Sequence, residues 1–168
     1  MLITLKLEKS VTNIPELSRA IDAFETIDEV YRLMQSRDAI KQGARVDFRT
    51  KQFKDIKGGE LERFNVTSPP EITISADNLW IAALLFILKD YSNAKKNISE
   101  AAEDTAFIAN LIKSIGEDQY QKAVISAKLF AEQIAEIEEA NMKMLKTKLD
   151  AALRILRNNI GSINTKGK

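Results

Sequence analysis

The chain has 168 residues, of which 45% are hydrophobic and 29% are charged, and its formal net charge is +1. This composition is ordinary for a globular protein, and the near-neutral charge does not indicate a nucleic-acid or membrane partner. The sequence contains no cysteine and no histidine, which excludes disulfides, thiolate metal sites and histidine-based triads or zinc sites built from this chain alone. We therefore expect no cofactor and no self-sufficient enzyme, with carboxylate-bound magnesium or calcium left open.

The N-terminal part predicts a strand followed by a helix. Residues 2–7 alternate apolar and polar side chains, as in a strand with one buried face, and not as in a signal peptide, so we expect a cytoplasmic protein. Asn13 is a good helix N-cap, Pro15 suits the first turn, and Glu16 follows the cap by three residues. Apolar residues spaced three or four apart continue this helix, which we end near Gly43.

Residues 44–76 predict two or three further strands. Lys57-Gly58-Gly59-Glu60 is a turn signal, and residues 61–66 and 71–75 are strand-like. The two prolines between them belong in a loop or at a strand end, because proline cannot donate a hydrogen bond within a central strand. Residues 1–76 are thus expected to form a small α+β domain with one helix and a mainly antiparallel sheet.

The next segment, residues 79–88, is apolar on every side, and Asp77 can cap it as a helix. A helix of this kind is usually buried in a core. Spanning a bilayer takes about 20 apolar residues, and this run stops at Lys89. We predict a buried helix, with association to a membrane through residues 79–88 as an alternative.

Helices are expected to fill the rest of the chain, residues 77–160, as a long hairpin or coiled coil, with residues 161–168 as a flexible tail. Gly116 separates a first helix from a very long one over residues 118–159, which would extend about 60 Å. Apolar residues along this helix alternate in spacings of four and three, which is typical of a coiled-coil seam. The predicted interface comprises Tyr120, Val124, Ile134, Asn141, Leu145, Leu149 and Leu156.

Charge along the same helix favours one way of pairing. Residues 132–139 are acidic, whereas the residues after Met142 are mainly basic. Two such helices would match opposite charges only if they ran antiparallel, so we expect an antiparallel homodimer. The alternatives are another protein partner, or a helix that folds back on residues 78–115 of its own chain.

A basic stretch with interleaved phenylalanines covers residues 32–64 and suggests single-stranded nucleic acid as another partner, because bases stack on rings while cations meet phosphates. Acidic residues in the same window, and the need of a small sheet for an aromatic core, argue against this interpretation. The residues that would contact nucleic acid are Arg45, Arg49, Lys51 and Lys54.

The order of elements carries one resemblance. A short strand, a helix, a hairpin, the segment Ser68-Pro69-Pro70-Glu71-Ile72 and an apolar helix from Leu79 resemble small α+β accessory modules of bacterial defence and signalling proteins, over residues 1–90. The resemblance implies a non-catalytic adaptor that assembles with, or is fused to, an effector. The function predicted from the sequence is therefore protein–protein interaction or oligomerisation, with nucleic-acid binding and membrane association as the alternatives.

Overall fold

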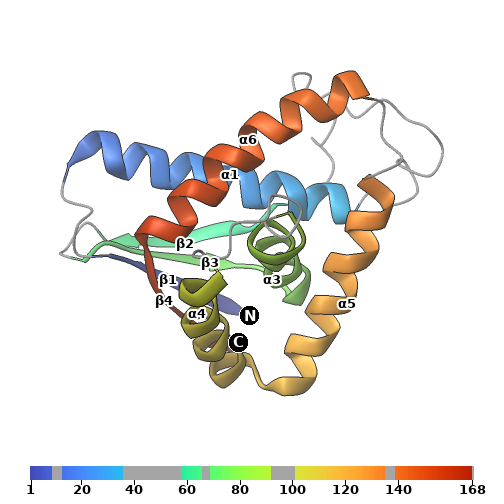
Figure 1. Cartoon of the computed structure of the whole chain (residues 1–168). Helices are drawn as coiled ribbons and strands as arrows, with labels where there is room; N and C mark the ends of the chain where they lie inside the picture. Colours follow the sequence, from blue (N-terminus) through green and yellow to red (C-terminus); the bar gives the residue numbers. More distant parts are fainter. Residues whose placement is uncertain (9–12, 36–57, 66–68, 92–100, 135–138, 168) are drawn as a thin grey trace.

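A computed structural model describes residues 1–8, 13–35, 58–65, 69–91, 101–134 and 139–167. Within them the fold is α+β with a four-stranded antiparallel sheet, which confirms the predicted fold class. The strands, in the spatial order β2-β3-β1-β4, are β1 (Leu2–Leu7), β2 (Glu60–Asn65), β3 (Glu71–Ser75) and β4 (Ile160–Lys166). The helices are α1 (Ile14–Gln35), α3 (Asn78–Leu85), α4 (Ala101–Ile115), α5 (Glu117–Ile134) and α6 (Glu139–Asn159), and a π-helix, η1 (Phe86–Tyr91), continues α3 (Figure 1).

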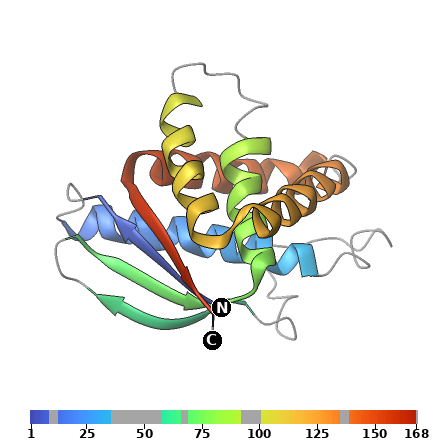
Figure 2. The same ribbon diagram turned by 90° about the horizontal axis from the view of Figure 1, so that it is seen from below.

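The sheet has one apolar face and one polar face, as the alternation in residues 2–7 predicts. Ile3 and Leu5 are buried and stand opposite Ile74 and Ile72 of β3. On the polar face the hydroxyls of Thr4 and Thr73 lie 2.9 Å apart. Seen from below, the sheet lies in front of α1, and α4 lies beyond its β4 edge (Figure 2). The described helices therefore enclose the apolar face and leave the polar one open.

The C-terminal residues complete this sheet, so the flexible tail expected over residues 161–168 is wrong for residues 161–166. They belong to β4, which pairs antiparallel with β1 along its length, Leu2 facing Lys166. Side chains of α4 accept hydrogen bonds from the outer edge of β4. Asn110 Oδ1 accepts from the Ile163 amide at 3.1 Å and Ser114 Oγ from the Thr165 amide at 2.8 Å. Backbone donors that an edge strand would expose to water are thereby satisfied within the chain.

Both predicted helix caps are present. The Asn13 side chain accepts a hydrogen bond from the Glu16 amide at 2.9 Å, at the start of α1. Asp77 likewise accepts from the Leu79 amide at 2.9 Å, at the start of α3. Each cap satisfies one amide that the first turn of a helix leaves without a partner. The predicted end of the first helix, near Gly43, lies outside the described residues.

The apolar run over residues 79–88 is a buried helical segment, as predicted. Every residue from Trp80 to Leu88 is buried, and the Trp80 side chain is only 1% exposed. The segment passes through the centre of the molecule, between α1, α5 and α6 (Figures 1 and 2). In the part of the chain that the structure describes, no helix is both long and apolar enough to cross a membrane. The core cluster that contains this segment includes residues of the predicted N-terminal domain, 1–76, and residues of the helical region after it.

The single long helix expected over residues 118–159 is wrong. In its place α5 ends at Ile134 and α6 begins at Glu139, and the two helices run in different directions (Figure 1). The predicted break at Gly116 is present. Gly116 separates α4 from α5 with a φ of 87°, a left-handed conformation that glycine adopts without a side-chain clash. Each of the two helices can therefore turn its own apolar face toward the centre of the chain.

Candidate functional site

The residues predicted as an oligomer interface lie inside the chain's own core. Tyr120, Ile134, Leu145, Leu149 and Leu156 are all buried in the central cluster, and Val124 packs against it. Asn141 lies in α6, but its side chain is outside the described part of the structure. None of the predicted interface side chains that the structure describes is exposed, whereas two other apolar residues of α5, Ile125 and Leu129, are. Folding back within one chain accounts for the periodicity that predicted the seam.

The four residues predicted to contact nucleic acid, Arg45, Arg49, Lys51 and Lys54, lie in the segment 36–57, outside the described residues. The turn predicted at Lys57-Gly58-Gly59-Glu60 is described only from Gly58 onward, where β2 begins at Glu60. The nucleic-acid interpretation stays a prediction from the sequence.

Polar side chains gather where η1 meets α5 and α6. Lys89 Nζ donates to Tyr120 Oη at 2.9 Å and lies 5.5 Å from the centre of its ring. Tyr91 Oη donates to the Asp150 carboxylate and lies 3.3 Å from the carbonyl oxygen of Lys146. Burial and the Asp150 carboxylate raise the pKa of Tyr91 above its ordinary value, so this hydroxyl remains a donor at neutral pH. These contacts link η1 to α5 and to α6.

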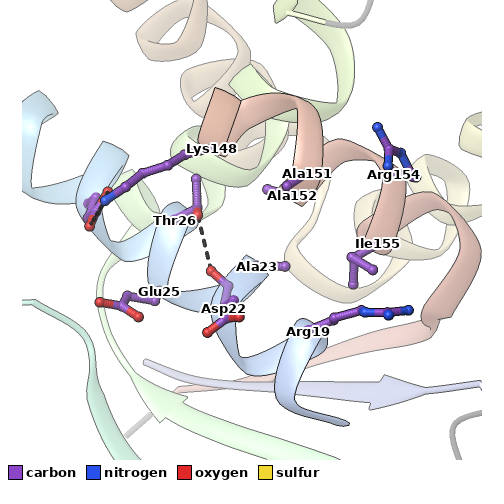
Figure 3. Close-up of a pocket in the computed structure, with 11 residues that line it drawn as sticks. Arg19, Asp22, Ala23, Glu25, Thr26, Lys148, Ala151, Ala152, Arg154 and Ile155 are labelled. Carbon is purple, nitrogen blue, oxygen red and sulfur yellow. Dashed lines mark hydrogen bonds and ion pairs between the residues drawn. The ribbon is translucent and has the colours of Figure 1, made fainter. Parts of the chain in front are cut away.

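A groove of about 670 Å³ lies between α1 and α6. Its floor is made of small or apolar side chains, because Ala23 and Thr26 of α1 face Ala151, Ala152 and Ile155 of α6 (Figure 3). Short side chains leave open space where two helices would otherwise interdigitate. The Thr26 hydroxyl donates to the Asp22 carbonyl at 3.0 Å, so it is satisfied within α1. The floor is therefore mostly apolar.

Charged side chains form the two rims of this α1/α6 groove. The α1 rim carries Arg19, Asp22, Glu25 and Glu29, and the α6 rim carries Lys148 and Arg154. At one end Lys148 Nζ reaches across to the Glu29 carboxylate at 2.8 Å, which closes the groove there. At the other end Arg19 and Arg154 lie on either side of Ile155 (Figure 3).

A second hollow, of about 390 Å³, lies on the other flank of α1, between that helix and strands β2 and β3. Its wall is almost wholly apolar and includes Phe24, Phe64 and Trp80. At its mouth Asp28 is held from both sides. It accepts from the Gly59 amide at 2.6 Å and forms an ion pair with Arg32 at 3.0 Å. We call this hollow the aromatic pocket.

Neither hollow was predicted from the sequence, although one signal was present. Arg19, Asp22 and Glu29 recur at helical spacing on one face of the first helix, with Thr26 between them, and this is the pattern of an exposed helix face. The opposite wall, α6, could not be paired with that face, because helices far apart in the sequence meet only through tertiary packing. Among the described residues no group of three or more carboxylates lies close enough together to hold a metal ion.

Comparison with models of protein families, with curated protein sequences and with solved structures gave no match for this chain. The assignment of a function consequently depends on the two hollows and on the chemistry of the residues that line them.

Proposed function

We propose that this chain is a non-catalytic protein-binding module that takes up an amphipathic helix of a partner protein in the α1/α6 groove. The observation that carries the proposal is the groove itself: a floor of small and apolar side chains between two charged rims, open to solvent. Binding of an amphipathic helix in such a groove is a recurrent mode of peptide recognition. The lack of histidine and cysteine in the chain supports binding over catalysis.

The dimensions of the groove fit a short helix. Its α1 wall extends from Arg19 to Glu29, which corresponds to about 15 Å along a helix axis, or about three turns. Only one face of the partner helix would enter, and that face needs small or medium apolar side chains to approach Ala151 and Ala152. Three turns present about three or four such residues at spacings of three and four.

The rims define the charges that the partner helix would carry. Asp22 of α1 favours lysine or arginine on the edge of the partner that faces it. The guanidinium groups of Arg19 and Arg154 point apart at this end (Figure 3), and each favours a carboxylate of the partner or the negative C-terminal end of its helix. Exposed charges of this kind select orientation and partner more than they raise affinity.

A second copy of the chain fits this site less well than a single helix. Two grooves that faced each other across a twofold axis would enclose an unfilled space, and stable interfaces are packed about as densely as protein interiors. The homodimer predicted from the sequence would therefore have to use another surface. Light scattering coupled to size exclusion tests it directly.

A matched pair of variants tests the proposal. The Ala151 side chain is exposed on the groove floor, whereas Ala109 is exposed on α4, away from the groove. Ala151→Trp should fill the groove, and Ala109→Trp should leave it open. We would select helical 14-residue peptides against the wild-type chain from a displayed library, and then measure their affinity for each variant by fluorescence anisotropy.

We expect the selected peptides to carry apolar residues at helical spacing with basic residues along one edge. They should bind Ala109→Trp as tightly as the wild type and lose binding to Ala151→Trp. Arg154→Glu should weaken those peptides that carry a carboxylate at the corresponding end. Peptides that bind Ala151→Trp unchanged, or that show no helical pattern, would refute the groove as the binding site.

A further inference from the structure

The aromatic pocket on the other flank of α1 differs from the α1/α6 groove in having almost no polar wall. Phe24, Phe64 and Trp80 supply three rings, and Ile72 and Ile74 close the side formed by β3. Its volume of about 390 Å³ lies within the range of small-molecule sites. The sheet and the buried central helix form one side of the pocket, and α1 forms the other.

Two carboxylates lie at the mouth of the aromatic pocket, and one of them is paired with Arg32. Glu25 and Asp28 are the two charged residues among the described residues that line it. Asp28 is already engaged, because Arg32 and the Gly59 amide bind its two oxygens. The Glu25 side chain is exposed and points away from α6 (Figure 3), so it is the carboxylate available to a ligand.

At the mouth of the aromatic pocket the backbone of Gly58 and Gly59 passes close to side chains of α1 and α3. A side chain at Gly58 would clash with the Asp28 carboxylate and the Arg32 guanidinium, so glycine lets the backbone pass close to this ion pair. At Gly59 an added carbon would stand 3.4 Å from Trp80 Nε1, which shows how near this loop runs to the indole. The turn therefore positions both the Asp28–Arg32 pair and the edge of the pocket.

We propose that the aromatic pocket binds a small apolar ammonium compound, a primary amine with an aromatic or branched aliphatic body. The body would lie among the three rings, and the ammonium group would remain at the mouth beside Glu25. Cations are attracted both by carboxylates and by the faces of aromatic rings, whereas a carboxylate ligand would be repelled at this mouth. The aromatic pocket shares Glu25 with the lining of the helix-binding groove, and the other described residues that line the two sites differ.

Three probes that share one body and differ in charge test the proposal: 2-phenylethylamine, 2-phenylethanol and 3-phenylpropanoate. Saturation-transfer NMR with the full chain measures their binding, and the emission of Trp80, the only tryptophan, reports whether the ligand reaches this pocket. We expect the amine to bind about two- to five-fold more tightly than the alcohol, as for one exposed ion pair, and the carboxylate to bind most weakly. Glu25→Gln should remove the preference for the amine over the alcohol.

Two substitutions on α1 form the matched control for location. Ile21 lines the pocket and is 45% exposed, whereas Ile14, on the same helix, is 82% exposed and lies outside it. Ile21→Trp should abolish binding of the amine, and Ile14→Trp should leave it unchanged. The proposal is overturned if the three probes bind equally, if none binds at millimolar concentration, or if Ile21→Trp binds the amine like the wild type.

Discussion

The two halves of the central helical segment are held in place by different forces. In α3, every residue from Trp80 to Leu85 is buried, and apolar contact with α1 and α5 surrounds it. In η1, Phe86, Ile87 and Leu88 are buried too, and the rings of Phe86 and Phe130 meet edge to face with 4.8 Å between their centres. The residues after them are polar, and Lys89 and Tyr91 donate hydrogen bonds to side chains of α5 and α6. Burial stabilises α3 and the first three residues of η1, whereas hydrogen bonds determine how the end of η1 is oriented.

This difference shows how one segment can serve both as core and as anchor. Apolar packing is tolerant of small shifts, but a buried or half-buried hydrogen bond requires one geometry. The π-helical turn accommodates one extra residue per turn, which changes the direction in which the residues after it point. Lys89 and Tyr91 thereby reach Tyr120 and Asp150 on two different helices.

The largest effect is expected in the first half. Leu84 is fully buried in the central cluster, so Leu84→Ala should lower the free energy of unfolding by about 2–5 kcal/mol, because it removes apolar contact and leaves a cavity. Urea denaturation measures the change. The exposed Ile14 provides the control, since Ile14→Ala should change the free energy of unfolding by no more than about 0.5 kcal/mol. Equal effects at the two positions would contradict the placement of this segment in the core.

A smaller effect is expected in the second half. Tyr91→Phe removes the donor to Asp150 and keeps the ring, so it should lower the free energy of unfolding by about 1 kcal/mol. The pKa of Tyr91 is raised in the folded state, so its contribution is complete below about pH 10 and is lost as the pH rises further, when the unfolded chain ionises first. Above about pH 10 the free energy of unfolding should therefore fall more steeply with rising pH in the wild type than in the variant. Parallel curves would show that the hydroxyl is not buried against Asp150.

The smallest effect should have the opposite sign. Burial raises the pKa of Asp90 above 3.8, although Lys128 and Lys89 oppose the shift. A raised pKa means that the charged form is disfavoured by folding, so the wild type gains stability as the pH falls through that pKa. Asp90→Asn should slightly raise the urea midpoint at pH 7 and lose this advantage below about pH 4. A destabilised variant at pH 7 would indicate that the two lysines outweigh burial.

The sequence predicted best the elements whose boundaries are local. Asn13, Asp77 and Gly116 each mark a helix boundary, because capping and left-handed backbone depend on one residue and its neighbours. The division between α5 and α6 had no such mark. Residues 132–139 are all helix-favouring glutamate, glutamine, alanine and isoleucine, so local propensity continued the helix across a boundary that tertiary packing creates.

The last strand and both hollows escaped prediction for a related reason. β4 has only two apolar residues, Ile160 and Ile163, among polar ones and a glycine, which is the composition of a tail. It becomes a strand because β1 pairs with one of its edges and α4 accepts hydrogen bonds from the other. The hollows likewise depend on which helix stands beside α1. The local sequence pattern predicts neither β4 nor the hollows, because both depend on residues that are distant in the sequence.

The pairing of β4 with β1 joins the two ends of the described chain, Leu2 opposite Lys166. Closing a loop that contains nearly the whole chain costs more entropy than forming any contact between neighbouring elements. We therefore expect the helices and the β2–β3 pair to form early, and the β1–β4 ladder to form last, once the folded interior has brought the two ends together. Until that final step one edge of β1 has no partner and is exposed to other chains. The pairing of β4 with β1 is therefore expected to limit the rate of folding and to end that exposure.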